Sequence, residues 1–408
     1  MTKTHDQKEI IKSSLFQMIA ICPEETKDVL AEELRMLGAQ SVDPQFKAVH
    51  FECDEKLFYE AHLKIRSASR LLRVVKEFAA KDERMLYDQA RRVNWGDVLT
   101  VKGTFSIEGV PGERGEGVMT SNTISKRVRE AMQTWFLDKK GERVLVNLED
   151  PDATFIAFTR GGRCIVSVDT SGKSMHKRGY RSDKHPAPLK ETMAASLLMK
   201  LGYKGDVPLY DPMCGSGTLA IEAASMALGK AALIHRKKGE FGFERLAFFN
   251  SQLWREVQEE ARDGKSDELA MPIFASDISA PYIEAARDNA LRARVEKFIN
   301  FSKVDFFESD APAPTGLIIT NVPYGERIKG EFDGDDEMFF KAIGDKLKKS
   351  YTGWRAAILV AEASPWKSIG LKPSRKIKLL NGSIEVRLLV FDLYQGSKKG
   401  SPEQRALN

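Results

Sequence analysis

Apolar residues in the second half of the chain fall into short runs separated by segments of helical period. Runs of strand length stand at 273–277 and 315–320, and apolar positions recur at helical spacing over 189–201 and 280–293. Strands that alternate with helices in this way are typical of a parallel sheet covered on both faces. The pattern predicts an α/β fold, a doubly wound Rossmann-like sheet, over residues 191–396.

The first part of the chain has a different order. An apolar run at 15–21 is followed by helical spacing that ends at Gly38, and further strand-like runs stand at 49–53 and 69–78. This order predicts a ferredoxin-like α+β domain over residues 1–80.

A second small α+β domain is predicted over residues 81–172. Its clearest element is a helix over 121–137, in which apolar residues recur on one face. Lys126 and Arg127 lie off that face. Taken alone they are better explained as a solvated helix surface, and in a nucleic-acid-binding protein they are candidate phosphate contacts.

Residues 173–190 form a basic linker between this domain and the parallel sheet. From residue 160 to 190 there are eight Lys or Arg against two Asp, which gives a local charge of +6. Tyr180 and His176 are candidates for stacking on bases, and Lys177, Arg178 and Arg181 for contacts with phosphates, as in single-stranded nucleic-acid binding. The alternative is a basic segment packed on an acidic surface of the protein.

Composition argues against a membrane-spanning, a secreted or a metal-binding protein. The net charge of +5 permits an anionic partner without requiring one, and no run approaches the ~20 apolar residues that span a bilayer. The first residues lack an apolar signal core, and the four cysteines are scattered, with no pair at metal-ligand spacing. We therefore expect a cytoplasmic protein with no metal and no membrane contact. Residues 397–408 are expected to form a flexible tail.

A glycine turn follows the first predicted strand of the parallel sheet. Gly215 and Gly217 allow a sharp turn and close approach of a ligand, and the helix behind them offers free N–H groups. Asp211 in front of the glycines, with no Gly-Lys-Ser/Thr, argues against a phosphate-binding P-loop.

Two further acids, Asp277 and Asp305, end later strands of the same sheet. A carboxylate at the first can bind a ribose diol, and one at the second can bind the amine of a base, although each could also cap a helix. Together they fit a nucleoside ligand. The candidate cofactor-binding residues are Asp211, Pro212, Gly215, Ser216, Gly217, Thr218, Asp277, Ile278, Asp305 and Phe306.

The sequence Asn321-Val322-Pro323-Tyr324 closes another strand and is the candidate catalytic motif. The Asn321 side-chain oxygen and the Val322 carbonyl, held by Pro323, can accept from an exocyclic amino group, while Tyr324 stacks on an extruded base. No strong base is needed, because an amine can attack first and lose its proton afterwards. The alternative is a strand-end turn with a buried tyrosine.

These two motifs, Asp211–Ala224 and Asn321–Arg327, resemble those of class I S-adenosylmethionine-dependent RNA methyltransferases with an N-terminal THUMP domain. Bacterial 23S rRNA guanine-N2 methyltransferases fit best, and residues 176–181, 187–192 and 241–244 are also similar to that family. The resemblance implies that the glycine turn binds the methionine part of S-adenosylmethionine, Asp277 the ribose and Asp305 the adenine amine. It also implies that Asn321 to Tyr324 receives the target base.

The resemblance leaves other functions open. The common family motif is Asn-Pro-Pro-Tyr, so Val322 is a departure, which bears on the choice between guanine and adenine as the target and not on the reaction type. A related enzyme could methylate guanine N2 of tRNA instead of 23S rRNA. More distant alternatives are methylation of adenine N6 in DNA and a non-catalytic RNA-binding assembly factor.

Overall fold

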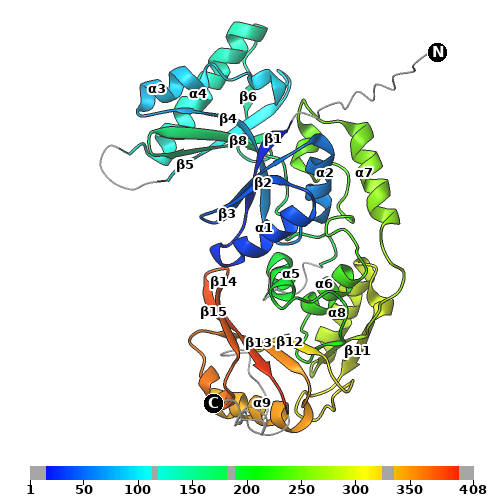
Figure 1. Ribbon diagram of the computed structural model, residues 1–408. Helices are drawn as coiled ribbons and strands as arrows, with labels where there is room; N and C mark the ends of the chain where they lie inside the picture. Colours follow the sequence, from blue (N-terminus) through cyan, green and yellow to red (C-terminus); the bar gives the residue numbers. More distant parts are fainter. Residues whose placement is uncertain (1–14, 113–117, 182–188, 324–334, 395–408) are drawn as a thin grey trace, which may run out of the picture. The chain divides into compact units, whose positions relative to one another are not determined.

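The computed structural model describes residues 15–112, 118–181, 189–323 and 335–394. These residues form two compact units, which Figure 1 traces in the order of the chain. The first unit runs to Met175 and also takes in residues 236–263. The second comprises residues 176–235 and the chain from Gly264 onward.

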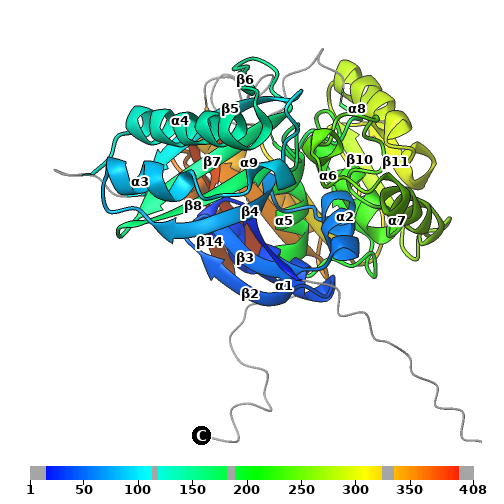
Figure 2. The same ribbon diagram turned by 90° about the horizontal axis from the view of Figure 1, so that it is seen from above.

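The first unit is built on an eight-stranded sheet with the order β2-β3-β1-β4-β8-β7-β5-β6 among the described residues. Because β4 pairs antiparallel with β8, one sheet runs through both predicted α+β domains. Helices α3 and α4 lie side by side in Figure 2. The elements are β1 (Phe16–Ile21), α1 (Lys27–Met36), β2 (Gln40–Gln45), β3 (Ala48–Cys53), α2 (Glu55–Lys64), β4 (Arg70–Ala79), α3 (Glu83–Ala90), β5 (Thr104–Pro111), α4 (Ser121–Lys140), β6 (Leu145–Val146), β7 (Ala153–Arg160) and β8 (Arg163–Asp169).

Two strands of this sheet differ from the sequence prediction. Strand β2 was not predicted, because it is a polar and mostly exposed edge strand that contains Pro44 and shows no apolar alternation. The apolar spacing of residues 99–107 also predicts a strand, whereas β5 begins only at Thr104 and ends at Pro111. Helix α4 is confirmed, and its predicted apolar stripe is buried.

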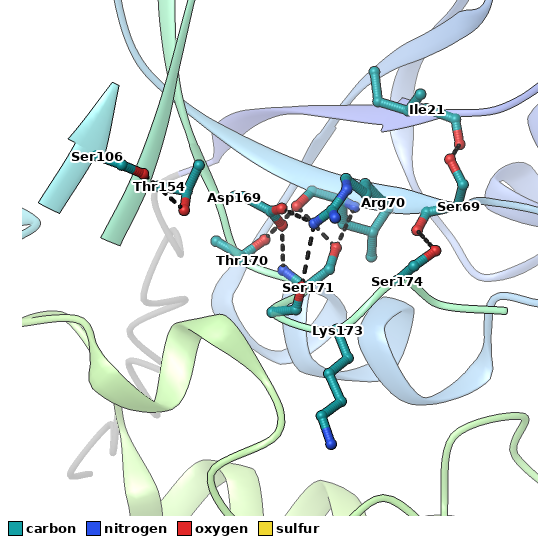
Figure 3. Close-up of polar contacts among 12 residues, drawn as sticks. Ile21, Ser69, Arg70, Ser106, Thr154, Asp169, Thr170, Ser171, Lys173 and Ser174 are labelled. Carbon is teal, nitrogen blue, oxygen red and sulfur yellow. Dashed lines mark hydrogen bonds and ion pairs between the residues drawn. The ribbon is translucent and has the colours of Figure 1, made fainter. Parts of the chain in front are cut away.

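An ion pair joins the two halves of the sheet where β4 begins and β8 ends (Figure 3). The guanidinium of Arg70 pairs with the buried Asp169 and also donates to the carbonyl of Gly172, 3.2 Å away. The second carboxylate oxygen of Asp169 accepts from the N–H of Ser171 at 2.8 Å, and the Ser171 hydroxyl accepts from the N–H of Leu71 at 2.6 Å. Both oxygens of a buried carboxylate are thus satisfied, which ties the end of β8 to β4.

Residues 236–263 belong to the first unit, although they lie within the range 191–396 predicted for the Rossmann-like domain. Their aromatic side chains pack on α2: the ring of Phe243 lies 5.5 Å from that of Phe58, and Trp254 lies 5.6 Å from Tyr59, between centroids. Helix α7 (Ser251–Asp263) lies beside α2 in both views (Figures 1 and 2). These aromatic residues thus cover a helix.

The second unit contains a seven-stranded sheet with the order β11-β10-β9-β12-β13-β15-β14 among the described residues. Strands β9 to β13 are parallel, and β15 runs antiparallel to both β13 and β14. The elements are α5 (Glu191–Lys200), β9 (Leu209–Asp211), α6 (Thr218–Ala227), β10 (Ile273–Asp277), α8 (Ala280–Arg292), β11 (Ile299–Lys303), β12 (Leu317–Asn321), α9 (Asp336–Ser350), β13 (Arg355–Ala361), β14 (Arg375–Asn381) and β15 (Ile384–Asp392).

This sheet is covered on both faces, as predicted. Neighbouring residues on a strand point to opposite faces, so Ile318 packs in the cluster around α9, whereas Ile319 packs in the cluster around α5, α6 and α8. The strand order reverses between β9 and β12, because later strands are added outward on either side of this pair. Ligands of doubly wound sheets bind beyond the carboxyl ends of the strands at such a switch point.

Candidate active site

The glycine turn lies at this switch point, between β9 and α6. Gly215 has a φ of +51° and Gly217 a φ of +82°, a backbone region that favours glycine. A Cβ on Gly217 would lie 3.0 Å from the Cβ of Ala286 on α8, whereas one on Gly215 would meet nothing within 4 Å. Gly217 is the N-cap of α6 and provides no side-chain cap. The first N–H groups of α6 therefore face a turn whose surface at Gly215 is open, as a bound ligand requires.

Two side chains from the neighbouring elements fix this turn. One oxygen of the Asp277 carboxylate accepts from the N–H of Gly215 at 2.9 Å, and the other accepts from the N–H of Ser279 at 2.9 Å. The side-chain amide of Asn289, buried on α8, donates to the carbonyl of Ser216 at 3.0 Å. The sequence analysis missed Asn289, although a polar residue among the apolar positions of a helix is a usable signal for a buried hydrogen bond.

Asp211 lies at the end of β9 and is only 1% exposed. Its Oδ1 atom has no hydrogen-bond partner among the described residues. Burial, helped by the nearby Asp277 carboxylate, raises the pKa of Asp211 to about 7. A buried carboxylate oxygen without a partner fits a ligand that brings a positive charge or N–H donors, such as the methionine end of S-adenosylmethionine.

The remaining predicted cofactor residues differ in exposure. Ile278 is 64% exposed, an unusual position for a large apolar side chain and one that a bound nucleoside could cover. Asp305 follows β11 and accepts from the N–H of Phe307 at 2.9 Å. The Phe306 ring is buried and stacks on Tyr351 at 5.7 Å between centroids, so only the Phe306 backbone can contact a ligand. Pro212, Ser216 and Thr218 are buried in or beside the glycine turn.

The Asn-Val-Pro part of the candidate catalytic motif closes β12, on the other side of the switch point. The Asn321 side-chain oxygen is buried and has no hydrogen-bond partner among the described residues. Val322 is 1% exposed, and its N–H donates to the carbonyl of Leu359 on β13 at 3.3 Å. A proline at this position could not donate, so valine extends the pairing of the two strands by one hydrogen bond. Pro323 is partly exposed, and Tyr324 lies outside the described residues.

The basic segment occupies positions different from those predicted. The Arg178 guanidinium and the Tyr180 ring are both buried. Arg178 pairs with Glu222 of α6 at 3.6 Å, and the Tyr180 hydroxyl donates to the same carboxylate at 3.1 Å. The prediction that Tyr180 stacks on RNA is therefore wrong. The alternative, packing on acidic groups of the protein, applies to both residues, because a buried carboxylate requires a partner.

The other predicted RNA contacts differ in exposure. Lys177 and Lys126 are exposed, and His176 is half-buried, with its pKa lowered to about 4 by burial. Arg127 is paired with Glu83 of α3 at 2.9 Å and with Glu130 at 3.1 Å. An exposed cation can reach a phosphate, so Lys126 and Lys177 remain candidates for RNA contact.

The part of the chain that the structure describes contains no cluster of three or more His, Cys, Asp or Glu side chains that could hold a metal ion. Within it, no helix has both the length and the apolar composition needed to span a membrane.

Comparison with known proteins matches residues in both units to known domain families. Residues 178–389 match the RMKL-like methyltransferase domain, residues 17–72 the RlmL ferredoxin-like domain and residues 80–169 the THUMP domain. The chain is 34% identical to a "Putative RNA methyltransferase" of Synechocystis sp. over 90% of its own length and 94% of that protein. It is 33% identical to the ribosomal RNA large subunit methyltransferase K/L of Shewanella frigidimarina, where it covers 94% of itself but spans only 54% of that relative.

A solved structure agrees with this assignment. The crystal structure of SMU.472, "a putative methyltransferase complexed with SAH", superimposes with a TM-score of 0.82 at 25% identity and covers 94% of this chain and 99% of that one. The chain thus belongs to the RMKL-like family of THUMP-containing, S-adenosylmethionine-dependent RNA methyltransferases.

Proposed function

We propose that this protein transfers a methyl group to the exocyclic N2 of a guanine in 23S ribosomal RNA, in the cytoplasm. The observation that carries the proposal is the buried Asn321 side-chain oxygen, which has no hydrogen-bond partner within the described parts of the chain and lies at the end of β12, across the switch point from the glycine turn. An amide oxygen is an acceptor, and an exocyclic amine presents the N–H that it lacks.

The residues of the site have separate tasks in this proposal. The N–H groups at the start of α6, with Asp211 and Asp277, hold the donor, which supplies an electrophilic methyl group on its sulfonium. Asn321 accepts an N–H of the target amine and so directs the nitrogen lone pair at that methyl carbon. As the N–C bond forms, the C–S bond breaks and its electron pair stays on sulfur. The amine then gives up one proton to water.

Ribosomal RNA is proposed as the substrate because relatives that align with 94% of this chain are named as methyltransferases of ribosomal RNA. The chain spans about half of those relatives. The proposal therefore concerns only the methyl transfer assigned to the part of those relatives that this chain matches.

Nucleoside mass spectrometry of 23S rRNA, tRNA and DNA from cells with and without the protein tests the proposal. We expect loss of N2-methylguanosine from 23S rRNA, restored by the wild-type chain but not by Asn321→Ala. Loss from tRNA would favour the tRNA enzyme, and loss of N6-methyladenine from DNA would favour a DNA methyltransferase. Unchanged nucleosides would favour the non-catalytic assembly factor, and each of these three results would overturn the proposal.

A further inference from the structure

The basic segment before α5 contains one arginine that contacts the glycine turn itself. Arg181 donates through Nη2 to the Thr218 hydroxyl at 2.8 Å and through Nη1 to the Ser216 hydroxyl at 3.4 Å. Its other contacts hold it there, because Nε donates to the buried Glu191 carboxylate of α5 at 2.9 Å and Nη2 to the Leu189 carbonyl at 3.3 Å. A residue expected to bind RNA is thus bonded to both residues that flank the N-cap of α6.

The same segment follows one face of α6. Thr218 and Glu222 are four residues apart and therefore lie on the same side of the helix. Arg181 binds the first, while Arg178 and Tyr180 bind the second. Two carboxylates from two helices are thus matched by two arginines from one short segment.

The contacts of Arg181 with the two hydroxyls can prevent these hydroxyls from capping the N–H groups at the start of α6. Ser and Thr hydroxyls close to a helix start compete for its backbone N–H groups, and a capped N–H is lost to a ligand. Gly217, the N-cap, has no side chain with which to cap. Ser216 and Thr218 are the hydroxyls on either side of it, and both are held by Arg181.

We infer that Arg181 is a positioning residue of the donor site, which holds the Ser216 and Thr218 hydroxyls so that the N–H groups at the start of α6 stay available to S-adenosylmethionine. The inference rests on the proposed function. It reassigns this part of the basic linker from the RNA to the methyl donor.

Calorimetric titration of the full-length protein with S-adenosylhomocysteine tests the inference. Arg181→Gln should weaken binding by about tenfold, the scale of one helix cap, with kcat at saturating donor within about twofold of wild type. Lys204→Gln removes an exposed cation of the same unit and is the matched control, with unchanged affinity. Affinity of Arg181→Gln within twofold of wild type would overturn the inference. A wild-type protein that does not bind S-adenosylhomocysteine would overturn the proposed function itself.

Arg181→Lys separates positioning from a structural ion pair. Lysine keeps the charge beside Glu191, so the unfolding temperature should stay close to that of wild type. A single ammonium cannot reproduce the guanidinium fork that reaches Glu191 and two hydroxyls at once, so affinity should still fall by roughly fivefold. Full recovery of affinity in this variant would reduce Arg181 to a structural ion pair and overturn the inference.

A double-mutant comparison tests the mechanism. When Ser216→Ala and Thr218→Ala remove the competing hydroxyls, the further change Arg181→Gln should cost little affinity. If Arg181→Gln costs as much in that background as in the wild type, the hydroxyls are not the route by which Arg181 acts, and the inference fails.

Discussion

The Asp277 carboxylate accepts a hydrogen bond from the N–H of Gly215 at 2.9 Å, so the end of β10 holds the turn that follows β9. The residue predicted to bind the ribose is therefore also a support of the turn predicted to bind the methionine. In the proposed assignment, one side chain therefore serves both the ribose and the methionine part of the donor.

Asp277→Asn should weaken S-adenosylhomocysteine binding by roughly tenfold or more. An asparagine side chain has one acceptor oxygen, so one of the two partly buried N–H groups of Gly215 and Ser279 loses its partner. Calorimetric titration measures the effect, with the exposed Asp206→Asn as control. Equal affinity in the two variants would contradict this role of Asp277.

Asn321→Ala should reduce methyl transfer by roughly a hundredfold or more, while the affinity for S-adenosylhomocysteine stays within about twofold of wild type. The reason is that Asn321 is assigned to the acceptor amine and not to the donor. Single-turnover methylation of 23S rRNA and titration with S-adenosylhomocysteine give the two numbers. Activity equal to wild type would remove Asn321 from the mechanism.

Asp211 should make donor binding depend on pH. Its folded-state pKa of about 7 lies above the ordinary value of 3.8, so the carboxylate becomes fully charged only as the pH rises through about 7. The affinity for the positively charged donor should therefore increase between about pH 6 and 8. The same shift lowers the free energy of unfolding as the pH rises from about 4 to 7. Asp211→Asn should flatten both profiles, and an unchanged slope in this variant would assign the titration to another group.

The packing of residues 236–263 on α2 should contribute to the stability of the first unit. Trp254→Ala should lower its free energy of unfolding by about 3 kcal/mol or more, because a large buried ring is removed. Tyr59→Phe should cost about 1 kcal/mol, because the N–H of Asn250 loses its acceptor. Urea unfolding followed by tryptophan fluorescence measures both. Neither variant should change S-adenosylhomocysteine affinity, and a loss of stability below 1 kcal/mol in Trp254→Ala would refute this role.

Lys126 and Lys177 are the exposed members of the predicted RNA-binding set. Replacing both with glutamine should weaken RNA binding and lower the slope of log K against log salt by about 0.7–0.9 for each phosphate contact that is lost. Filter binding at several salt concentrations measures the slope. An unchanged slope would exclude these lysines from the RNA contact.

The sequence predicts the elements whose burial pattern is local. The stripe of α4 and the two-faced strand β12 are visible from spacing alone, because both faces of β12 and one face of α4 are buried. Strand β2 is missed because an exposed edge strand needs no apolar residue.

The candidate site shows the same division. Asp211, Gly215 and Asp277 could be placed at strand ends from the order of elements. The burial of Arg178 and Tyr180 could not, because it depends on Glu222, a residue more than forty positions later. The local charge of residues 160–190 can be counted from the sequence, with eight Lys or Arg. The carboxylates that the fold brings to these cations cannot be identified from the same segment.

The insertion of residues 236–263 into the first unit has a consequence for synthesis. The chain must be made through the glycine turn and α6 before Phe243 and Trp254 exist to cover α2. Domains usually fold one after another as the chain emerges from the ribosome. Here the N-terminal unit must wait for part of the catalytic unit. Phe58 and Tyr59 then remain without these aromatic partners in the nascent chain, a period in which a chaperone that binds exposed aromatic surface can act.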